Sequence, residues 1–274
     1  IGHLRLALAE NELVPDAGAR AENEIRLRER LVIPLEARFW GATEIADNLD
    51  RLYELQAVHG TPQDLFAVVH GLYDTHIIAG QATEALSYAN RMREIAEELD
   101  DNVLRFMQRH AHGMCAFVLG RFDDAIAIYD EALALCDLVP RQEVKRYYLA
   151  DMSLVDRCMQ AWAFALSGSD RERLPDVVAE AAHAVEATTE DFSQAYGMSI
   201  LASIHQTLSN PTEAVAYASR AHATSRAHRF KYWEAWSLII YGWGLAAGGA
   251  HADGIQRLES GLAKYLDTGA RQIT

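Results

Sequence analysis

The residues best suited to chemistry in this sequence are its eleven histidines, and their spacing limits what they can do. Two metal ligands on one face of a helix stand three or four residues apart. His110 and His112 are two residues apart, whereas His70 and His76 are six apart. We therefore interpret these histidines as packed or solvated side chains rather than as metal ligands.

The other reactive groups are also isolated from one another. Cys115, Cys136 and Cys158 are widely spaced and odd in number, which indicates small buried residues in a reducing compartment rather than disulfides or a zinc site. The sequence has no G-x-x-x-x-G-K-[ST] phosphate loop, no H-E-x-x-H and no G-x-S-x-G. We predict that the chain is not an enzyme and holds no metal or cofactor. A hydrolase assembled from distant residues is the least favoured alternative.

The overall charge excludes one large class of partners. The 25 Lys and Arg against 39 Asp and Glu give a formal net charge of −14, whereas nucleic-acid binding needs clustered positive charge. The basic stretch from Ser219 to Lys231 fits either a solvated helix face or a patch for an acidic partner. No apolar run reaches the roughly 18 to 20 residues that span a bilayer. The sequence predicts neither a nucleic-acid partner nor a membrane.

The elements that position these residues are predicted to be helices throughout. Ala, Leu, Glu, Arg and Gln dominate long segments, and apolar residues recur at spacings of three and four, as in Leu86, Ala89 and Met92. Prolines punctuate these segments, and no run alternates β-branched with polar residues as a half-buried strand would. The sequence predicts an all-α protein of about thirteen helices, mostly joined by short turns.

An internal repeat organises these helices. The stretch GRFDDAIAIYDEALAL, from Gly120 to Leu135, places a small residue five positions before an alanine and then apolar residues at helical spacing. Weaker copies begin at residues 80, 168, 209 and 249, so the period is about 40 residues. This length holds one helical hairpin, whose apolar flank is buried by stacking neighbours. One domain over residues 1–274 is predicted, with repeats at 17–60, 62–100, 101–140, 143–189, 191–228 and 230–268.

Glycine and alanine mark the places where the two helices of a hairpin should approach closely. Gly120 is expected to end a first helix in the left-handed conformation, and Ala125 is expected to lie where that helix presses on the second. Gly113 stands twelve residues before Ala125, as Gly242 stands twelve before Gly254. The structural positions assigned in this way are Gly80, Ala85, Gly113, Gly120, Ala125, Ala132, Ala202, Ala214, Gly242 and Gly254.

These positions resemble the tetratricopeptide repeat. The stretch from Gly120 matches the family's second-helix pattern of Gly, aromatic, Ala, aromatic and Ala, and Gly113 takes the glycine place of the first helix. The copies depart from the family in their longer period, against about 34 residues, and in lacking most of its Trp and closing Pro. More narrowly, the chain is similar to the C-terminal repeat region of bacterial predicted-ATPase proteins that carry a class III adenylate/guanylate cyclase domain. That resemblance is carried by YGWGLAAGGAHADGIQRLESGLAKYLDTGA, HGLYDTHIIAGQATEAL and FVLGRFDDAIAIYDEAL.

The resemblance implies a right-handed α-solenoid of antiparallel helix hairpins, belonging to a bacterial signal-transduction protein. Because the chain opens on Ile1 rather than Met, and neither end looks like a polar cap, we expect a fragment of a larger protein. The lack of a visible signal peptide and the cysteine usage predict a cytoplasmic location.

In such solenoids the first helices line a concave groove, so the resemblance also implies which residues face a ligand. Trp236 and Trp243 stand seven residues apart, two turns along one face, and either fill gaps in the core or form an aromatic wall for a ligand. The implied groove residues are His70, Asp74, Met107, His110, Met114, Phe117, Trp162, Tyr196, Ser199, Ser203, Trp236 and Trp243.

Two functions fit such a groove. The favoured one is a non-catalytic scaffold that binds a protein or peptide, or another domain of its own polypeptide. The alternative is a sensor that holds a small-molecule effector in the same place. Self-association into a homo-oligomer is a further possibility for a stack of repeats with open ends. A stabilising small ligand whose effect is lost in Trp236→Ala or Trp162→Ala would favour the sensor.

Overall fold

The computed structural model describes residues 1–39, 43–136 and 138–272, and this part of the chain contains fourteen helices and no strand. The all-α prediction is confirmed for these residues, with one helix more than expected. The helices are α1 (Gly2–Asn11), α2 (Ala17–Phe39), α3 (Thr43–His59), α4 (Pro62–Ile78), α5 (Ala82–Leu99), α6 (Asn102–Val118), α7 (Phe122–Cys136), α8 (Arg141–Val144), α9 (Met152–Ser167), α10 (Leu174–Ala187), α11 (Asp191–Thr207), α12 (Pro211–His228), α13 (Lys231–Ala247) and α14 (His251–Asp267).

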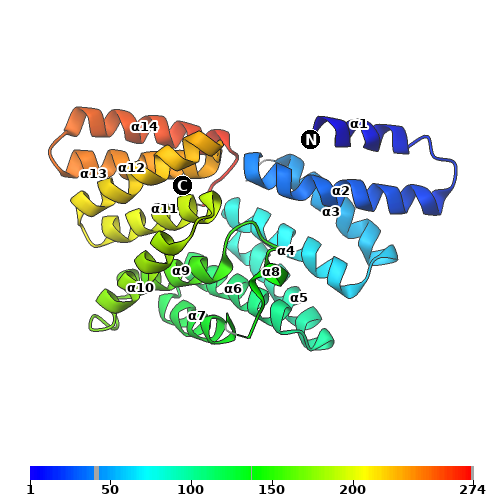
Figure 1. Ribbon diagram of the computed structural model, residues 1–274, viewed down its shortest axis with the longest axis horizontal. Coiled ribbons are helices and arrows are strands. Elements are labelled where there is room, and N and C mark those ends of the chain that lie inside the picture. The colour runs from blue at the N-terminus through cyan, green and yellow to red at the C-terminus, as the bar shows by residue number, and fades with distance from the viewer. Residues whose placement is uncertain (40–42, 137, 273–274) are drawn as a thin grey trace.

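The helices pack chiefly on their neighbours in the sequence, as successive hairpins. The hairpins α2/α3, α4/α5, α6/α7, α9/α10, α11/α12 and α13/α14 follow one another along a curved path, which Figure 1 shows from the blue N-terminal arm to the red C-terminal arm. Among the described residues, no helix is both long and apolar enough to cross a membrane.

Helix starts are set by capping side chains. Asp101 and Asp151 each accept hydrogen bonds from two backbone N–H groups in the first turns of α6 and α9. Thr61 and Asp64 form a reciprocal capping box at the start of α4. Pro34, in contrast, lies inside α2, so this proline does not separate two helices as the sequence pattern suggested.

Left-handed residues end five of the first helices; one is Gly168 after α9, with φ of 64°, and the other four are followed more closely by the second helix. Gly80, Gly120 and Gly249 have φ angles of 76°, 73° and 101°, and Ser209 takes the same place after α11 with φ of 55°. A residue without Cβ reaches this conformation at little cost, whereas serine is strained there. After each of these four residues the second helix begins two positions later, so the turn sets how closely the two helices of a hairpin pack.

Small residues line the seams inside the hairpins. Ala125 is fully buried. A Cβ added to Gly242 would come within 2.6 Å of the Gly254 carbonyl oxygen, so these two glycines bring α13 and α14 into backbone contact. At Gly113 an added Cβ would instead meet the ring of Tyr129 at 2.7 Å. The close crossing expected at Gly113 therefore accommodates an aromatic ring one turn beyond Ala125, rather than a second backbone.

The fourth predicted repeat, residues 143–189, contains an extra segment. Its first long helix, α9, begins only at Met152, because α8 and the loop after it come first. This segment carries Tyr147 and Tyr148 to the main hydrophobic core. The insertion explains why the copies at residues 120 and 168 lie further apart than the others.

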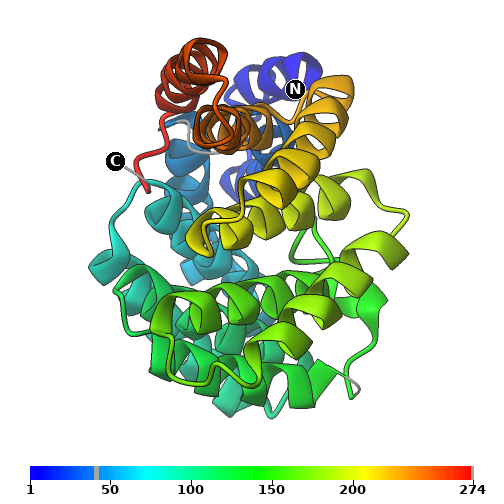
Figure 2. The same cartoon turned by 90° about the vertical axis from the view of Figure 1, so that its left-hand side faces the viewer.

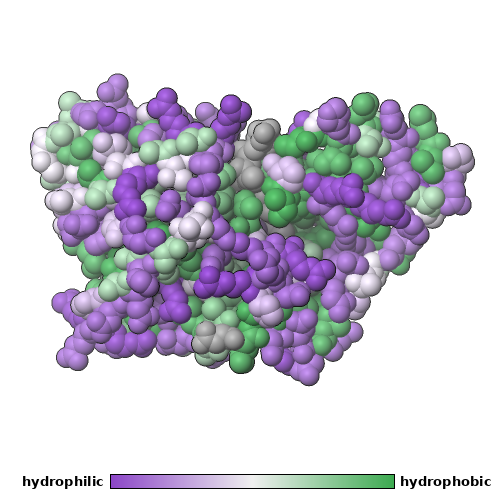
Figure 3. Space-filling view, viewed as in Figure 1, coloured by the Kyte–Doolittle hydropathy of each residue, from purple (hydrophilic) through white to green (hydrophobic). Residues whose placement is uncertain are grey.

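The C-terminal segment, residues 268–272, returns from α14 to the end of α4. The Arg271 backbone N–H donates a hydrogen bond to the Ile78 carbonyl oxygen at 2.9 Å, and the Tyr232 hydroxyl donates to Gln272 Oε1 at 2.9 Å. Ala270 is fully buried. Figure 2 shows this trace reaching the turn between α4 and α5, and Figure 3 shows a hollow between the N-terminal and C-terminal arms.

Candidate ligand cleft

A cleft lined by aromatic side chains lies where the first helices meet the C-terminal segment, and we call it the aromatic cleft. It holds about 870 Å³ when its opening to solvent is included, but only about 220 Å³ of this can be occupied by water-sized molecules, which is less than the roughly 300–1,000 Å³ of sites for drug-sized ligands. Tyr148 enters it from the loop after α8, and Gln272 from the C-terminal segment. Its lining residues are Tyr73, Asp74, Ile77, Ile78, His110, Met114, Phe117, Val118, Gly120, Phe122, Tyr148, Met159, Trp162, Leu166, Tyr196, Ile200, Tyr232, Trp233, Trp236 and Gln272.

The cleft brings together more than half of the predicted groove residues. Those that line it are Asp74, His110, Met114, Phe117, Trp162, Tyr196 and Trp236. The others lie elsewhere. His70 borders a second, more polar cleft, and Met107 is fully buried in the core. Trp243 is partly buried against the core outside the lining. The sequence allowed Trp236 and Trp243 to form one aromatic wall. In the structure only Trp236 borders the cleft, so the two residues do not form a continuous wall.

The two predicted groove serines lie behind the cleft wall rather than on it. Ser199 is fully buried, and its hydroxyl donates to the Ala195 carbonyl oxygen one turn earlier in α11 at 2.7 Å. Ser203 is also buried and donates to the Ser199 carbonyl oxygen at 3.0 Å. Short hydroxyl side chains satisfied by their own helix cannot reach a ligand.

Two of the three tryptophans that line the cleft are held by hydroxyls of α11. Trp236 Nε1–H donates to Ser203 Oγ, and Trp162 Nε1–H donates to Thr207 Oγ1, each at 3.0 Å. The two rings stand almost perpendicular, at 87°, with their centroids 6.2 Å apart. The indole N–H groups of Trp162 and Trp236 are therefore engaged inside the protein, and these two rings offer a ligand their apolar surfaces.

Further aromatic contacts extend this wall across four first helices. Phe117 of α6 lies 5.0 Å from Trp162, centroid to centroid. Trp233 of α13 lies 4.1 Å from Tyr196 of α11 and 6.1 Å from Trp236. Each such contact contributes about 0.5–1.5 kcal/mol beyond the area that it buries. These contacts favour one arrangement of the rings along the wall.

A histidine–aspartate pair supports the wall on the side of α6 and α9. His110 Nδ1 lies 2.5 Å from Asp156 Oδ1, and both side chains are almost completely buried. Burial raises the pKa of Asp156, and the charge and hydrogen bond of His110 oppose that rise. The second carboxylate oxygen, Asp156 Oδ2, has no hydrogen-bond partner among the described residues. The pair fixes the orientation of the His110 ring, which borders the cleft.

Tyr148 links this pair to a second buried histidine. The His70 ring packs edge-on against Tyr148, with centroids 5.5 Å apart, and the His110 ring lies 6.0 Å from the same tyrosine. Burial lowers the pKa of His70 to about 3, and the neighbouring His110 adds to that effect. His70 is therefore neutral at physiological pH. Its role is in the packing between the two clefts rather than in binding through charge.

The sequence analysis did not predict several residues that line or support the cleft. Tyr148 lies on the inserted segment, which no repeat pattern covers, and Gln272 lies beyond the last helix. Tyr232 and Trp233 precede Trp236 by four and three residues, so the helical spacing of the three aromatics is the signal that could have found them. Asp156 has no local signal, because its partner stands 46 residues earlier in the chain.

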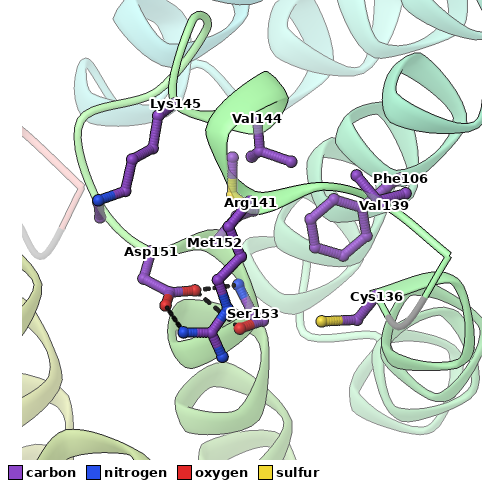
Figure 4. Close-up of a pocket in the computed structure, with 10 residues that line it drawn as sticks. Phe106, Cys136, Val139, Arg141, Val144, Lys145, Asp151, Met152 and Ser153 are labelled. Atoms are coloured by element: carbon purple, nitrogen blue, oxygen red, sulfur yellow. Dashed lines mark hydrogen bonds and ion pairs between the residues drawn. The ribbon is translucent and has the colours of Figure 1, made fainter.

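A smaller pocket lies beside α8, and its polar side chains bind other residues of the protein. Figure 4 shows Arg141 pointing toward Asp151, and their closest nitrogen and oxygen are 3.3 Å apart. Asp151 also accepts hydrogen bonds from Ser153 N and Oγ, at 3.1 and 2.7 Å, as the cap of α9. Arg141, Asp151 and Ser153 are thus engaged at the start of α9, and Lys145 of the same pocket pairs with Glu190 before α11.

The second, more polar cleft is lined by four carboxylates and one arginine. Two of them, Asp64 and Asp101, cap α4 and α6. Burial raises the pKa of Glu29, the charge of Asp64 raises it further, and a hydrogen bond from Gln56 opposes the rise. The described residues contain no group of three His, Cys, Asp or Glu side chains placed to hold a metal ion.

The aromatic cleft thus offers a space open to solvent, aromatic walls and few charged groups. This arrangement suits reversible binding of an apolar or aromatic-stacking ligand. Comparison with known proteins adds no family to this description. The chain matches no protein-family model and no curated protein.

Proposed function

We propose that this chain is a non-catalytic binding module that holds a small organic effector in the aromatic cleft. The observation that carries the proposal is the cleft itself: a space with aromatic walls, about 220 Å³ of which water-sized molecules can occupy, bordered at one side by the C-terminal segment. A cleft of that volume, lined mainly by apolar and aromatic side chains, suits a compact organic ligand. The buried His110–Asp156 pair and the two bonded indoles keep the walls in place before a ligand arrives.

The repeat architecture extends the proposal to the parent protein. We propose a right-handed solenoid of tetratricopeptide type with a period of about 40 residues, from a bacterial signalling protein in the cytoplasm. Sequence-adjacent hairpins, left-handed glycines after first helices and small residues in the seams support it. The three cysteines are unpaired, which supports a reducing compartment. Occupancy of the cleft would then be transmitted through the stacked hairpins to the rest of the protein.

A peptide is the second candidate, and the C-terminal segment favours it. Residues 268–272 of the chain already contact the cleft region, through the Arg271 N–H on the Ile78 carbonyl and through Gln272 on Tyr232. A segment of backbone outside the helices can therefore be bound at this side of the cleft. A partner segment could add main-chain hydrogen bonds in the same manner. This candidate corresponds to a protein-binding scaffold.

Thermal-shift screening separates the two candidates. The purified chain is screened against a library of small metabolites and, in parallel, against a library of short peptides. A metabolite that raises the melting temperature in a concentration-dependent way supports the effector site, because a ligand that binds only the folded state stabilises it. Stabilisation by peptides alone would support the protein-binding scaffold instead of the effector site. Stabilisation by neither library would contradict binding in the cleft.

A further inference from the structure

We propose that the second, more polar cleft, which we call the polar cleft, binds a linear aliphatic polyamine. It shares no described lining residue with the aromatic cleft, so the inference does not rest on the proposed function. The polar cleft lies between α2, α3, α4, the start of α6 and the segment that includes α8. Water-sized molecules can occupy about 380 Å³ of it, which lies within the roughly 300–1,000 Å³ of ligand sites.

The charged side chains that line the polar cleft are mostly negative. Its described carboxylates come from α2, α4, the N-cap of α6 and α8, and they are Glu29, Asp64, Asp101 and Glu143. Arg146 is the one described Lys or Arg in the lining, and its guanidinium lies 3.3 Å from the Glu143 carboxylate. The other three carboxylates form no ion pair with a Lys or Arg of the described chain.

The two carboxylates that cap helices keep part of their capacity to accept hydrogen bonds. Asp64 accepts the Thr61 backbone N–H and hydroxyl through Oδ2 alone. Asp101 accepts two backbone N–H groups of α6 through Oδ1 alone. One oxygen of each carboxylate therefore has no hydrogen bond from the described residues and can accept one from a ligand.

These negative charges act on common groups in the polar cleft. Burial raises the pKa of Glu29, and the charge of Asp64 adds to the rise. Burial also raises the pKa of the Tyr147 hydroxyl; Arg146 opposes this rise, whereas three carboxylates of the cleft add to it. The charges of four different elements thus converge on one space, where a cation would be stabilised from several sides.

A buried acceptor indicates that the ligand is a hydrogen-bond donor. Gln56 is 3% exposed, and its Nε2 donates to Glu29 Oε1 at 2.8 Å. This bond orients the amide, and Gln56 Oε1, which can only accept, has no partner among the described residues. His70, 2% exposed, also leaves its Nε2 without a described partner. A buried polar atom without a partner costs about 1–3 kcal/mol, which an ammonium N–H can offset and an anionic oxygen cannot.

The distribution of these groups favours a chain with several charges over a single ion. Four carboxylates line the polar cleft, yet among the described residues no three acidic, His or Cys side chains are placed to share one metal ion. The lining also includes apolar side chains, namely Val32, Leu49, Leu52, Val68 and Val103. A polyamine fits this mixture, because methylene segments that can pack on apolar side chains separate its ammonium groups.

The first experiment compares ligands of one length that differ in charge. In 1,8-diaminooctane and 1,8-octanediol only the end groups differ, and spermidine adds a charge within the chain. Binding of each to the intact chain, and of a short oligolysine peptide, is measured by isothermal titration calorimetry at physiological ionic strength. We expect both amines to bind, and the diamine to bind about tenfold or more tightly than the diol. Equal binding of the diamine and the diol, or binding of neither amine, would overturn the inference. Binding of the peptide alone would overturn it in favour of a basic protein segment.

Substitutions at one exposed position locate the binding. Ala67 of α4 lines the polar cleft and is exposed, so the chain is expected to fold with either charge there. Ala67→Lys should weaken spermidine binding about tenfold or more, whereas Ala67→Glu should retain or strengthen it. Ala127→Lys is the matched control, because it adds the same charge at an exposed position of α7 outside the cleft, and it should change the affinity about twofold or less. Equal losses in Ala67→Lys and Ala127→Lys would mean that only the net charge holds the amine, and the inference would be wrong.

A second set of variants separates the two clefts. Glu29→Gln removes one charge from the polar cleft and keeps an oxygen that can accept the Gln56 hydrogen bond, so spermidine binding should weaken about threefold or more. Glu22→Gln on the same helix changes an exposed carboxylate outside the lining and should have no such effect. Trp236→Phe alters the aromatic cleft alone and should leave spermidine affinity unchanged. Loss of spermidine binding in Trp236→Phe but not in Glu29→Gln would place the amine in the aromatic cleft and overturn the inference.

Discussion

His110 of α6 and Asp156 of α9 form a hydrogen-bonded pair, 2.5 Å apart, in which neither side chain reaches solvent. The pair joins two neighbouring hairpins at the wall of the aromatic cleft, which His110 borders. Breaking such a pair leaves an uncompensated polar group in the interior. Asp156→Ala should therefore lower the free energy of unfolding by about 3–5 kcal/mol, measured by urea denaturation at neutral pH.

The chain supplies its own control for that prediction. His228 and Asp191 form a second histidine–aspartate pair at 3.3 Å, but both side chains are largely exposed. Asp191→Ala should lower the free energy of unfolding by about 1 kcal/mol or less, because water screens and replaces the interaction. If Asp156→Ala and Asp191→Ala lowered the free energy of unfolding by similar amounts, burial of the His110–Asp156 pair would not contribute to stability.

The seam between α13 and α14 leaves no room for a side chain. A Cβ on Gly242 would lie 2.5 Å from the Leu258 backbone nitrogen and 2.6 Å from the Gly254 carbonyl oxygen, and backbone cannot move aside as a flexible side chain can. Gly242→Ala should reduce the free energy of unfolding by about 1–3 kcal/mol. Gly2→Ala is the matched control, since an added Cβ at Gly2 would meet nothing within 4 Å. A neutral or stabilising Gly242→Ala would contradict this close approach.

Because buried His70 is neutral in the folded chain, the free energy of unfolding should depend on pH. Its pKa is about 3 in the folded chain against 6.5 for the free side chain, so the unfolded state binds one more proton as the pH falls below about 6.5. Stability from this residue is complete above that pH and is lost as the pH falls toward 3. Between pH 7 and pH 5 the loss amounts to roughly 2 kcal/mol. We expect His70→Phe to remove this part of the pH dependence in urea denaturation. Parallel stability curves for the two proteins over pH 5–7 would refute a neutral His70.

The C-terminal segment should be detachable by one substitution. Ala270 is fully buried, so Ala270→Asp would place a carboxylate without a partner in the core. We expect the segment to leave the α4 end, and the Arg271 amide, which donates to the Ile78 carbonyl, to exchange with deuterium about tenfold or more faster. Ala250→Asp places the same charge at an exposed position before α14 and should leave that exchange rate unchanged.

The all-helical fold could be predicted from the sequence because the patterns that indicate it are local. The spacing of apolar residues within one helix, and the step from Gly120 to Ala125 that recurs along the chain, require no knowledge of distant contacts. The Gly120 turn and the buried Ala125 follow from the same pattern. Pro34 shows the limit of such signals, because it lies inside a helix that a proline rule would have ended.

The residues of the cleft could be predicted only in part, because they come from segments that are distant in the sequence. Trp162 and Trp236 followed from the register of the first helices, and the structure places both on one wall. Asp156 could not be recognised as the partner of His110, 46 residues away, since an isolated acid on a helix normally faces water. Gln272 reaches the cleft only through the return of the C-terminal segment, which no repeat pattern encodes.

The measurement that tests the proposed site most directly compares two tryptophans of one helix. Trp236 borders the aromatic cleft, whereas Trp243, two turns further along α13, lies outside its lining. The affinity of the first stabilising small ligand is measured by isothermal titration calorimetry for the wild type, Trp236→Phe and Trp243→Phe. A ligand in the cleft loses about tenfold or more in affinity with Trp236→Phe and stays within about twofold with Trp243→Phe. Equal affinity for all three proteins would contradict binding in the aromatic cleft.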